Sequence, residues 1–154
     1  AGADLADALR MLPRLSPRRG QVVVVSDFLD VPTAPGAPRT TWPEALRALA
    51  TRQQVIAVHV SDPREAELPD VGMLSVVDPE TGRLLHVQTR SKGLRERYAA
   101  AAAERLARIE RDVQRSGAEY LHVSTGRDWL TDVVAFAAGR RARHRADALG
   151  RVLS

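Results

Sequence analysis

The 154-residue chain has no cysteine, few aromatic residues and no long apolar run. The absence of cysteine excludes disulfide scaffolds, thiolate zinc sites and cysteine nucleophiles. No apolar stretch approaches the roughly 20 residues that a membrane-spanning helix needs. Aromatic residues make up only 4% of the chain, and none lies among the C-terminal arginines. Stacking of bases on aromatic rings is therefore not indicated as a mode of nucleic-acid binding.

Lysine is also scarce, because only Lys92 among the 23 basic residues is a lysine. The net charge of +4 lies entirely in residues 139–154, which hold five Arg and one Asp, so the rest of the chain is neutral. This basic helical tail can meet phosphates, or it can be a solvated helix end whose cations suit the helix dipole. We expect a protein partner rather than nucleic acid.

The composition, with 44% hydrophobic and 27% charged residues, is that of a folded protein. The length predicts a single domain spanning 1–154. No signal peptide and no initiator Met is present at Ala1. We interpret the chain as a piece of a longer protein and expect this segment to be cytoplasmic.

Apolar strand-like runs alternate with stretches of helical spacing along the chain. The run Gln21–Ser26 is rich in valine, which is typical of a strand buried on both faces. Thr125 is expected to cap the last helix, with Asp128 three residues later. Trp129, Leu130, Val133, Val134 and Phe136 form the apolar stripe of that helix. The predicted elements are a helix at 3–12, a strand at 21–27, a helix from 43, a strand at 55–60, a hairpin of 73–77 and 84–88, a helix at 92–116, a strand at 119–123 and a final helix.

This order predicts an α/β fold in three layers, a parallel sheet with helices on both faces and an added β-hairpin. Ligands of such sheets bind at the carboxyl ends of the strands. The polar residues at these ends are Ser26, Asp27, Asp30, Ser61, Asp62, Ser124 and Thr125. They can supply oxygen ligands to a hard cation such as magnesium, or they can cap helices and close turns. Both interpretations stay open.

The four histidines do not form a metal motif. His59, His86 and His122 fall in predicted strands, and His144 falls in the basic tail. A strand histidine is typically a half-buried residue with a hydrogen-bond partner. The sequence also contains no Gly-x-Ser-x-Gly nucleophile elbow, no phosphate-binding loop and no Gly-x-Gly-x-x-Gly dinucleotide-binding motif.

Four sequence blocks occur in a specific order: 22–30 (VVVVSDFLD), 62–65 (DPRE), 68–72 (LPDVG) and 78–82 (DPETG). With the long Arg/Ala helix and the segment Ser124–Leu130 that follow them, they resemble the C-terminal half of the domain of unknown function 58 family. The resemblance implies a divergent, partial von Willebrand factor type A-like domain with a Rossmann-like fold. Related proteins are encoded beside MoxR-type AAA+ ATPases, which implies work on the assembly or activation of other complexes.

The resemblance also implies a metal-ion-dependent adhesion site, which von Willebrand type A domains build from three loops. The first loop carries an Asp-x-Ser-x-Ser motif, the second a Thr and the third an Asp. Ser26–Asp27 resembles the third loop, so Asp27 is the candidate metal ligand. The sequence has no Asp-x-Ser-x-Ser motif. We therefore expect no tightly bound divalent metal in this chain alone, and magnesium only if upstream residues complete the site.

Three functions are compared. The first is a non-enzymatic protein-interaction module that presents the carboxyl edge of its sheet to a partner. The second is a metal-dependent hydrolase or nuclease that uses Asp27, Asp30 and Asp62. The third is a nucleic-acid binder that uses the basic tail, residues 139–154. We favour the first, because the motif blocks are specific and no general base is evident.

The resemblance finally implies that the strand at 21–27 is a fourth strand whose neighbour would be a first strand. Without that neighbour, one edge of the 21–27 strand lacks a partner. We expect a second copy of this chain, an upstream polypeptide or the 73–88 hairpin to cover it.

Overall fold

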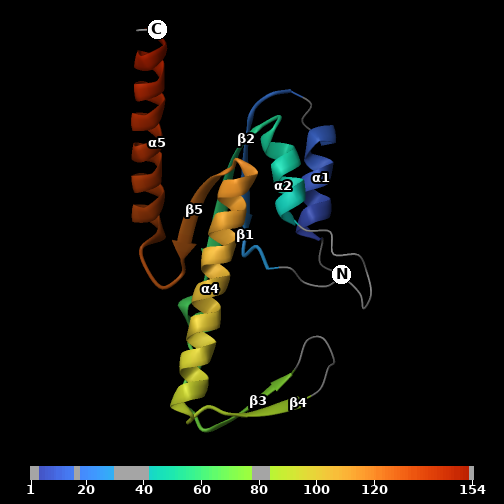
Figure 1. The fold of residues 1–154 in the computed structure, drawn as a ribbon, viewed down its shortest axis with the longest axis vertical. Helices are drawn as coiled ribbons and strands as arrows, with labels where there is room; N and C mark the ends of the chain where they lie inside the picture. The colour runs from blue at the N-terminus through green and yellow to red at the C-terminus, as the bar shows by residue number, and fades with distance from the viewer. Residues whose placement is uncertain (1–3, 16–17, 30–41, 78–83, 153–154) are drawn as a thin grey trace. The chain divides into compact units, whose positions relative to one another are not determined.

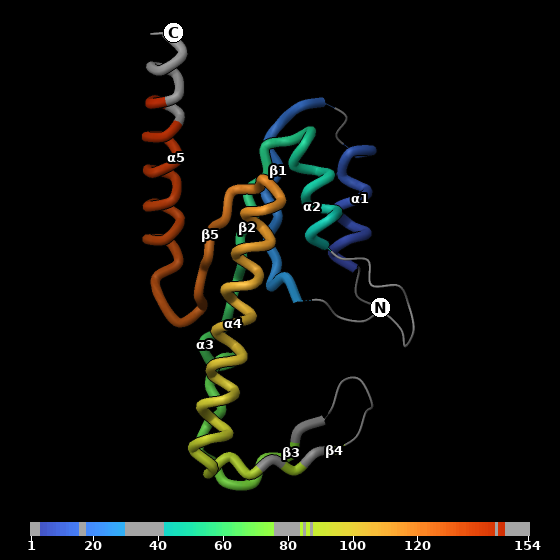
Figure 2. The backbone as a smooth tube through the Cα atoms, in the orientation of Figure 1, coloured from blue at the N-terminus to red at the C-terminus, as the bar shows by residue number. Residues whose placement is uncertain are grey.

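The computed structural model describes residues 4–15, 18–29, 42–77 and 84–152 (Figures 1 and 2). The described residues within 1–61 and 109–154 form one compact unit, and those within 62–108 form another. The elements in chain order are α1 (Leu5–Leu15), β1 (Gln21–Ser26), α2 (Trp42–Ala50), β2 (Gln54–Ser61), α3 (Pro63–Ala66), β3 (Met73–Val77), β4 (Leu84–Gln88), α4 (Lys92–Ser116), β5 (Glu119–Ser124) and α5 (Trp129–Val152).

The first unit contains a three-stranded parallel sheet in the order β1-β2-β5. The register pairs Val24 of β1 with Ala57 of β2, and Ala57 with Tyr120 of β5. Side chains alternate along a strand, so these three residues share one face of the sheet. The predicted parallel α/β arrangement with flanking helices, a Rossmann-like fold, is confirmed.

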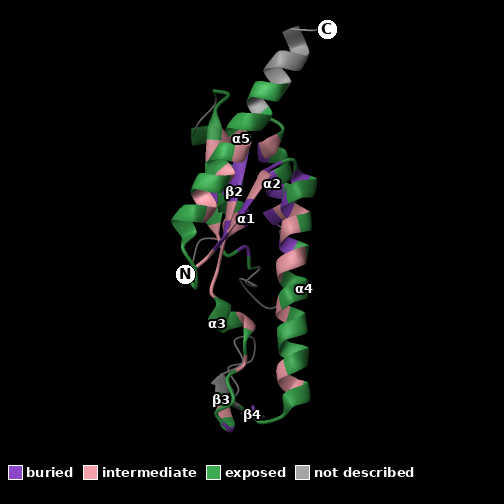
Figure 3. Ribbon diagram, turned by 90° about the vertical axis from the view of Figure 1, so that its left-hand side faces the viewer, coloured by how far each residue is buried: buried purple, intermediate pink, exposed green. Residues whose placement is uncertain are grey.

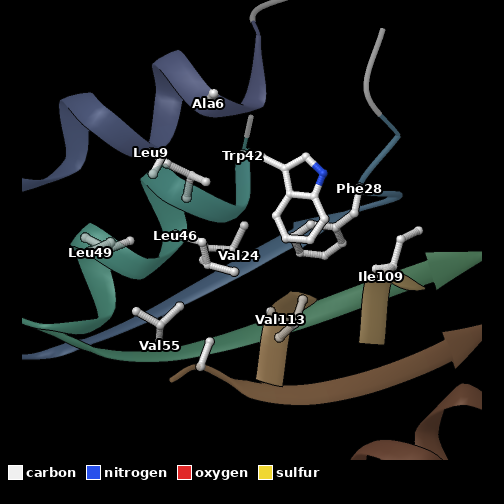
Figure 4. Packing of buried hydrophobic residues seen from close by; sticks show 13 residues of the cluster. Ala6, Leu9, Val24, Phe28, Trp42, Leu46, Leu49, Val55, Ile109 and Val113 are labelled. Atoms are coloured by element: carbon white, nitrogen blue, oxygen red, sulfur yellow. The ribbon is translucent and has the colours of Figure 1, made fainter. Parts of the chain in front are cut away.

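The hydrophobic core lies on this face, between the sheet and the helices α1, α2 and the end of α4 (Figure 4). Leu46 of α2 and Val113 of α4 are fully buried there. In Figure 3 the buried residues gather on β2 and on α1 and α2. Gly117 ends α4 with a φ of +87°, a conformation that glycine adopts without steric strain.

Two arginines of α5 bind strand residues on the opposite face of the sheet. The Arg140 guanidinium donates to the Glu119 carboxylate at 2.8 Å, to the Gln21 side chain at 2.7 Å and to the Gln54 side chain at 3.4 Å. These three acceptors are the first residues of β5, β1 and β2. Arg143 adds a second ion pair with Glu119, at 3.2 Å. One side chain therefore joins the amino ends of all three strands.

The strand β1 differs from the expectation of burial on both faces. Val24 is buried, whereas Val23 and Val25 are 53% and 66% exposed. The strand lies at the end of the order β1-β2-β5, and α5 contacts β5, at the other end. A run of valines cannot distinguish an edge strand from a central one, because both are apolar.

Two helix ends also differ from the expectation. α1 continues through Pro13 to Leu15, since a proline within the last turn removes only one backbone hydrogen bond. α5 begins at Trp129, and its first turn is capped by Asp128, which accepts from the Leu130 amide at 3.1 Å and the Thr131 hydroxyl at 2.7 Å. Thr125 does not cap α5 and instead donates its amide to the Ser61 carbonyl.

The apolar stripe expected on the last helix is only partly covered. Val133 and Phe136 are half-buried. Trp129, Leu130 and Val134 are each more than half exposed. The helical spacing of these residues places them on one face of the helix but does not predict which of them becomes buried.

The second unit contains α3, the β3-β4 hairpin and the first part of α4. The antiparallel hairpin is confirmed with the predicted bounds, while its connecting loop, 78–82, lies outside the described residues. It forms a sheet of its own and does not pair with β1. The buried Thr89 hydroxyl donates to the Gly72 carbonyl at 2.8 Å and accepts from the Val71 amide. In the part of the chain that the structure describes, no helix is long and apolar enough to cross a membrane.

Replacement of Arg140 by alanine should destabilise the first unit by about 1–2 kcal/mol, because Arg140 is largely buried and its loss leaves Glu119 and two glutamines without a shared donor. Urea unfolding followed by the fluorescence of the buried Trp42 measures the change. Arg141→Ala is the matched control, since Arg141 is exposed on the same helix. Equal midpoints for the two variants would contradict the role given to Arg140.

Candidate functional site

The carboxyl ends of β1, β2 and β5 lie at one edge of the sheet, because the strands are parallel. Ser26 ends β1, and Ser61 and Ser124 end β2 and β5 in register with each other. Asp27 and Thr125 follow directly. Asp62 follows Ser61 as the first residue of the second unit. Asp30 lies outside the described residues.

The side chains after β1 make local hydrogen bonds. The Ser26 hydroxyl accepts from the Phe28 amide at 3.0 Å, and the Asp27 carboxylate accepts from the Leu29 amide at 3.1 Å. Bonds of a side chain to the backbone two residues on are typical of turns. They hold Phe28 at a φ of +52°, which is unusual for a residue with a side chain. Its ring is buried and packs edge-on against Trp42, with the ring centroids 4.9 Å apart.

The polar residues after β2 and β5 are engaged in the same way. The Asp62 carboxylate accepts from the Arg64 amide at 2.9 Å and caps α3. The Ser124 hydroxyl accepts from the Gly126 amide, and the Thr125 amide donates to the Ser61 carbonyl. Turn closure and helix capping thus account for the described contacts of Ser26, Asp27, Asp62, Ser124 and Thr125. A shared ligand site among them stays a prediction.

A histidine cluster lies on the core-facing side of the sheet, just before this edge, and the sequence interpretation did not assemble it. His59 and Tyr120 share a hydrogen bond of 2.9 Å, and Ser61 and His122 share one of 2.7 Å. The two imidazole rings are 5.3 Å apart between centroids. His59 and His122 are partners in the β2-β5 register, and this pairing of strands brings them together. The sequence shows only that His59 and Ser61, and likewise Tyr120 and His122, are two residues apart, a spacing that places each pair on one face of its strand.

Burial is the main cause that lowers the pKa of both histidines below its ordinary value. The proximity of His122 lowers the pKa of His59 further, while the Asp27 carboxylate opposes this. Arg127 lowers the pKa of His122, against Asp132 and Glu110. Burial, with the Glu110 carboxylate, raises the pKa of Tyr120 to about 12, so its hydroxyl stays protonated and can donate to a neutral His59.

The arrangement suits a structural polar cluster better than a metal centre. Among the described residues, no three His, Asp or Glu side chains are grouped so that they can hold a metal ion. Asp27, the candidate metal ligand, is exposed and bonded to its own turn. His59, His86 and His122 each have a hydrogen-bond partner, as expected for strand histidines.

The histidine pair should make the first unit sensitive to acid. Because the folded-state pKa values are lowered, the unfolded chain binds protons more readily. The contribution of the neutral pair to stability is complete above about pH 6.5 and is lost as the pH falls through the folded-state values. Unfolding in urea at a series of pH values between about 7.5 and 5 measures this loss, because this range spans the ordinary pKa of histidine. The double variant His59→Gln/His122→Gln should make the free energy of unfolding less dependent on pH. An unchanged dependence would show that the histidine pair is not its cause.

Magnesium should not bind tightly to this chain. Calorimetric titration of the full chain with magnesium chloride is expected to show no saturable heat. Among the described residues, Asp27 is not grouped with two further side chains that could bind the same ion. Micromolar binding that is lost in Asp27→Ala would show that the expectation is wrong.

Comparison with known proteins places the chain among bacterial relatives without an assigned activity. It is 41% identical over 138 residues to uncharacterised proteins of Mycobacterium tuberculosis and Mycobacterium bovis, which covers 90% of this chain and 41% of each relative. It is 40% identical to an uncharacterised protein of Mycobacterium avium and covers 76% of that protein. The chain thus spans about two fifths of the length of the first two relatives.

No solved structure matches the chain significantly. The model of the family described as "Protein of unknown function DUF58" matches residues 1–108, which is more than half of the chain. The resemblance found in the sequence blocks is therefore confirmed at the level of the family, and the chain belongs to the DUF58 family of proteins of unknown function.

Proposed function

We propose that the chain is a non-enzymatic protein-interaction module of a von Willebrand type A-like protein, and that its partner is a MoxR-type AAA+ ATPase. The observation that carries a protein partner is the position of β1 at the end of the described sheet. Among the described strands, β1 pairs with β2 alone. Its outward-facing Val23 and Val25 are exposed, and no residue from Gln21 to Ser26 is charged.

Edge strands of soluble proteins are normally protected by charges, prolines, bulges or a covering segment. β1 has no charge and no proline, and its register with β2 runs without a bulge. Among the described strands, the outer backbone amides and carbonyls of β1 have no partner, and they form a template for one more strand. This supports a partner that supplies an extended segment and pairs with β1 by strand addition.

The residues that flank β1 indicate which segment fits. Arg18 and Arg19 precede the strand and Asp27 follows it, and all three are exposed. A partner strand with apolar residues in its centre, an acidic residue beside Arg18 and Arg19, and a basic residue beside Asp27 would match these charges. We therefore propose that the ATPase supplies an extended apolar segment with opposite charges at its two ends.

An upstream polypeptide stays an expected occupant of this edge, and a second copy of this chain is the competitor that can be compared on geometry. Antiparallel pairing of two β1 strands places the same face of both sheets on one side, so α1 and α2 of both copies would share that side. Paired strands lie about 4.8 Å apart, whereas packed helices need about 8–10 Å. A single added strand brings no further helices, and this favours the partner's segment over self-association through β1.

The hydrolase or nuclease stays the alternative function. It requires several carboxylates around one cation. Asp27 and Asp62 each accept a backbone amide in a turn or cap, which favours the structural interpretation of both. Binding of nucleic acid by the basic tail is also less favoured, because two of its arginines, Arg140 and Arg143, form ion pairs with Glu119. We propose that the segment works in the cytoplasm and that magnesium joins it only where further residues complete the site.

The double variant Val23→Lys/Val25→Lys should weaken binding to a purified MoxR-type ATPase at least tenfold, because two charges then line the free strand. Biolayer interferometry measures the affinity. The matched control is Val71→Lys/Met73→Lys, which changes two equally exposed apolar residues of the second unit.

Light scattering of the chain alone separates the two occupants. A monomer that binds the ATPase through Val23 and Val25 agrees with the proposal. A dimer that the same double variant dissociates would replace it with self-association. Equal binding by both double variants would exclude β1 as the interface.

A further inference from the structure

A cavity of about 510 Å³ opens at the amino edge of the sheet, the end opposite to the strand ends described above. Its walls are two segments, the one that enters β1 and the one that joins α2 to β2. The lining residues are Arg19, Gly20, Gln21, Ala50, Thr51, Arg52, Gln53 and Gln54. Pockets that bind small molecules are commonly about 300–1,000 Å³ in volume.

The two walls are fastened together by a buried glutamine. The Gln53 side-chain amide donates to the Arg18 carbonyl at 2.8 Å, and its oxygen accepts from the Gly20 amide at 2.6 Å. The Gln54 amide donates to the Gly20 carbonyl at 2.9 Å. Arg19 therefore stands between two anchored residues of one wall. A site whose backbone is fixed in this way is organised before a ligand arrives.

The second wall is equally fixed, and its acceptors are already used. The Thr51 amide donates to the Arg47 carbonyl, and the Thr51 hydroxyl donates to the Ala48 carbonyl at 2.8 Å. The amides of Arg52 and Gln53 both donate to the Leu49 carbonyl. The carbonyls of Arg47, Ala48 and Leu49 are thus engaged within the wall and fix its backbone.

The charges that face the cavity are positive. Arg19 and Arg52 line it, are exposed and form no ion pair within the described ranges. No lining residue is acidic. Arg140 donates to Gln21 and Gln54, which line the same cavity, so a third guanidinium lies at its border. Guanidinium groups bind phosphate oxygens in a bidentate manner.

We propose that this cavity is an oxyanion-binding site for a phosphorylated small molecule, in which Arg19 and Arg52 hold the phosphate and Gln53 is a positioning residue. The volume exceeds that of one phosphate group, so the ligand carries further atoms between the two walls. The site uses none of the exposed valines of β1 but shares Arg19 with the proposed partner interface, so Arg52 is the residue that separates the two proposals.

Isothermal titration of the full chain with pyrophosphate, a nucleoside triphosphate and inorganic phosphate tests the proposal. Arg19→Gln and Arg52→Gln should each lower the affinity about tenfold or more, as expected for one lost charge-assisted contact. Each should also reduce the dependence of affinity on salt. Arg111→Gln is the matched control, since Arg111 is exposed on α4 and does not line the cavity. It should change neither quantity.

Gln53→Ala separates positioning from charge. It leaves both guanidiniums in place, so the affinity should fall while its dependence on salt stays the same, and urea unfolding shows whether the variant is folded. Tighter binding of the triphosphate or pyrophosphate than of inorganic phosphate supports a phosphorylated small molecule. Equal binding of sulfate and pyrophosphate, no binding of any of the anions, or an equal loss in Arg111→Gln would overturn the site.

Discussion

The register of the three parallel strands is the constraint on which the first unit depends. It places Val24, Ala57 and Tyr120 on one face of the sheet, and this face receives the helices and the core. The same register brings His59 beside His122, two polar groups that the core tolerates because each has a hydrogen-bond partner. A shift of one residue would move the core-facing valines to solvent and separate the histidine pair.

The two edges of this sheet differ in how their polar groups are used. At the carboxyl edge, the carboxylates and hydroxyls close turns and cap helices, and Phe28 adopts a strained backbone to place its ring in the core. At the amino edge, the backbone is fixed by Gln53 and the charged groups of Arg19 and Arg52 remain without an ionic partner in the described residues. Polar residues that are already satisfied contribute to the fold, whereas preorganised and unpaired charges are available to a ligand.

Arg140 shows how a charged tail can serve the fold. Its position in an arginine-rich helix suggests a solvated surface or a phosphate contact, yet it joins the first residues of three strands. The exposed valines of β1 show the opposite case, since a run typical of a buried strand lies at an edge. In both cases the neighbour in space, and not the residue type, decides what the side chain does.

The sequence by itself determined the order of the elements apart from the short α3, the parallel α/β class, and the bounds of the hairpin and of α4, because hydrophobic periodicity and glycine or proline signals act over short distances. The four ordered sequence blocks indicated the family. It also placed Ser26, Asp27, Ser61 and Ser124 at the ends of strands. Only the tertiary structure decided which strand lies at the edge, that the Thr125 amide donates to the Ser61 carbonyl, and that Arg19 and Arg52 line one cavity. These features depend on contacts between residues distant in the chain, such as Gln53 with Arg18 or Arg140 with Gln21, and no local pattern encodes such contacts.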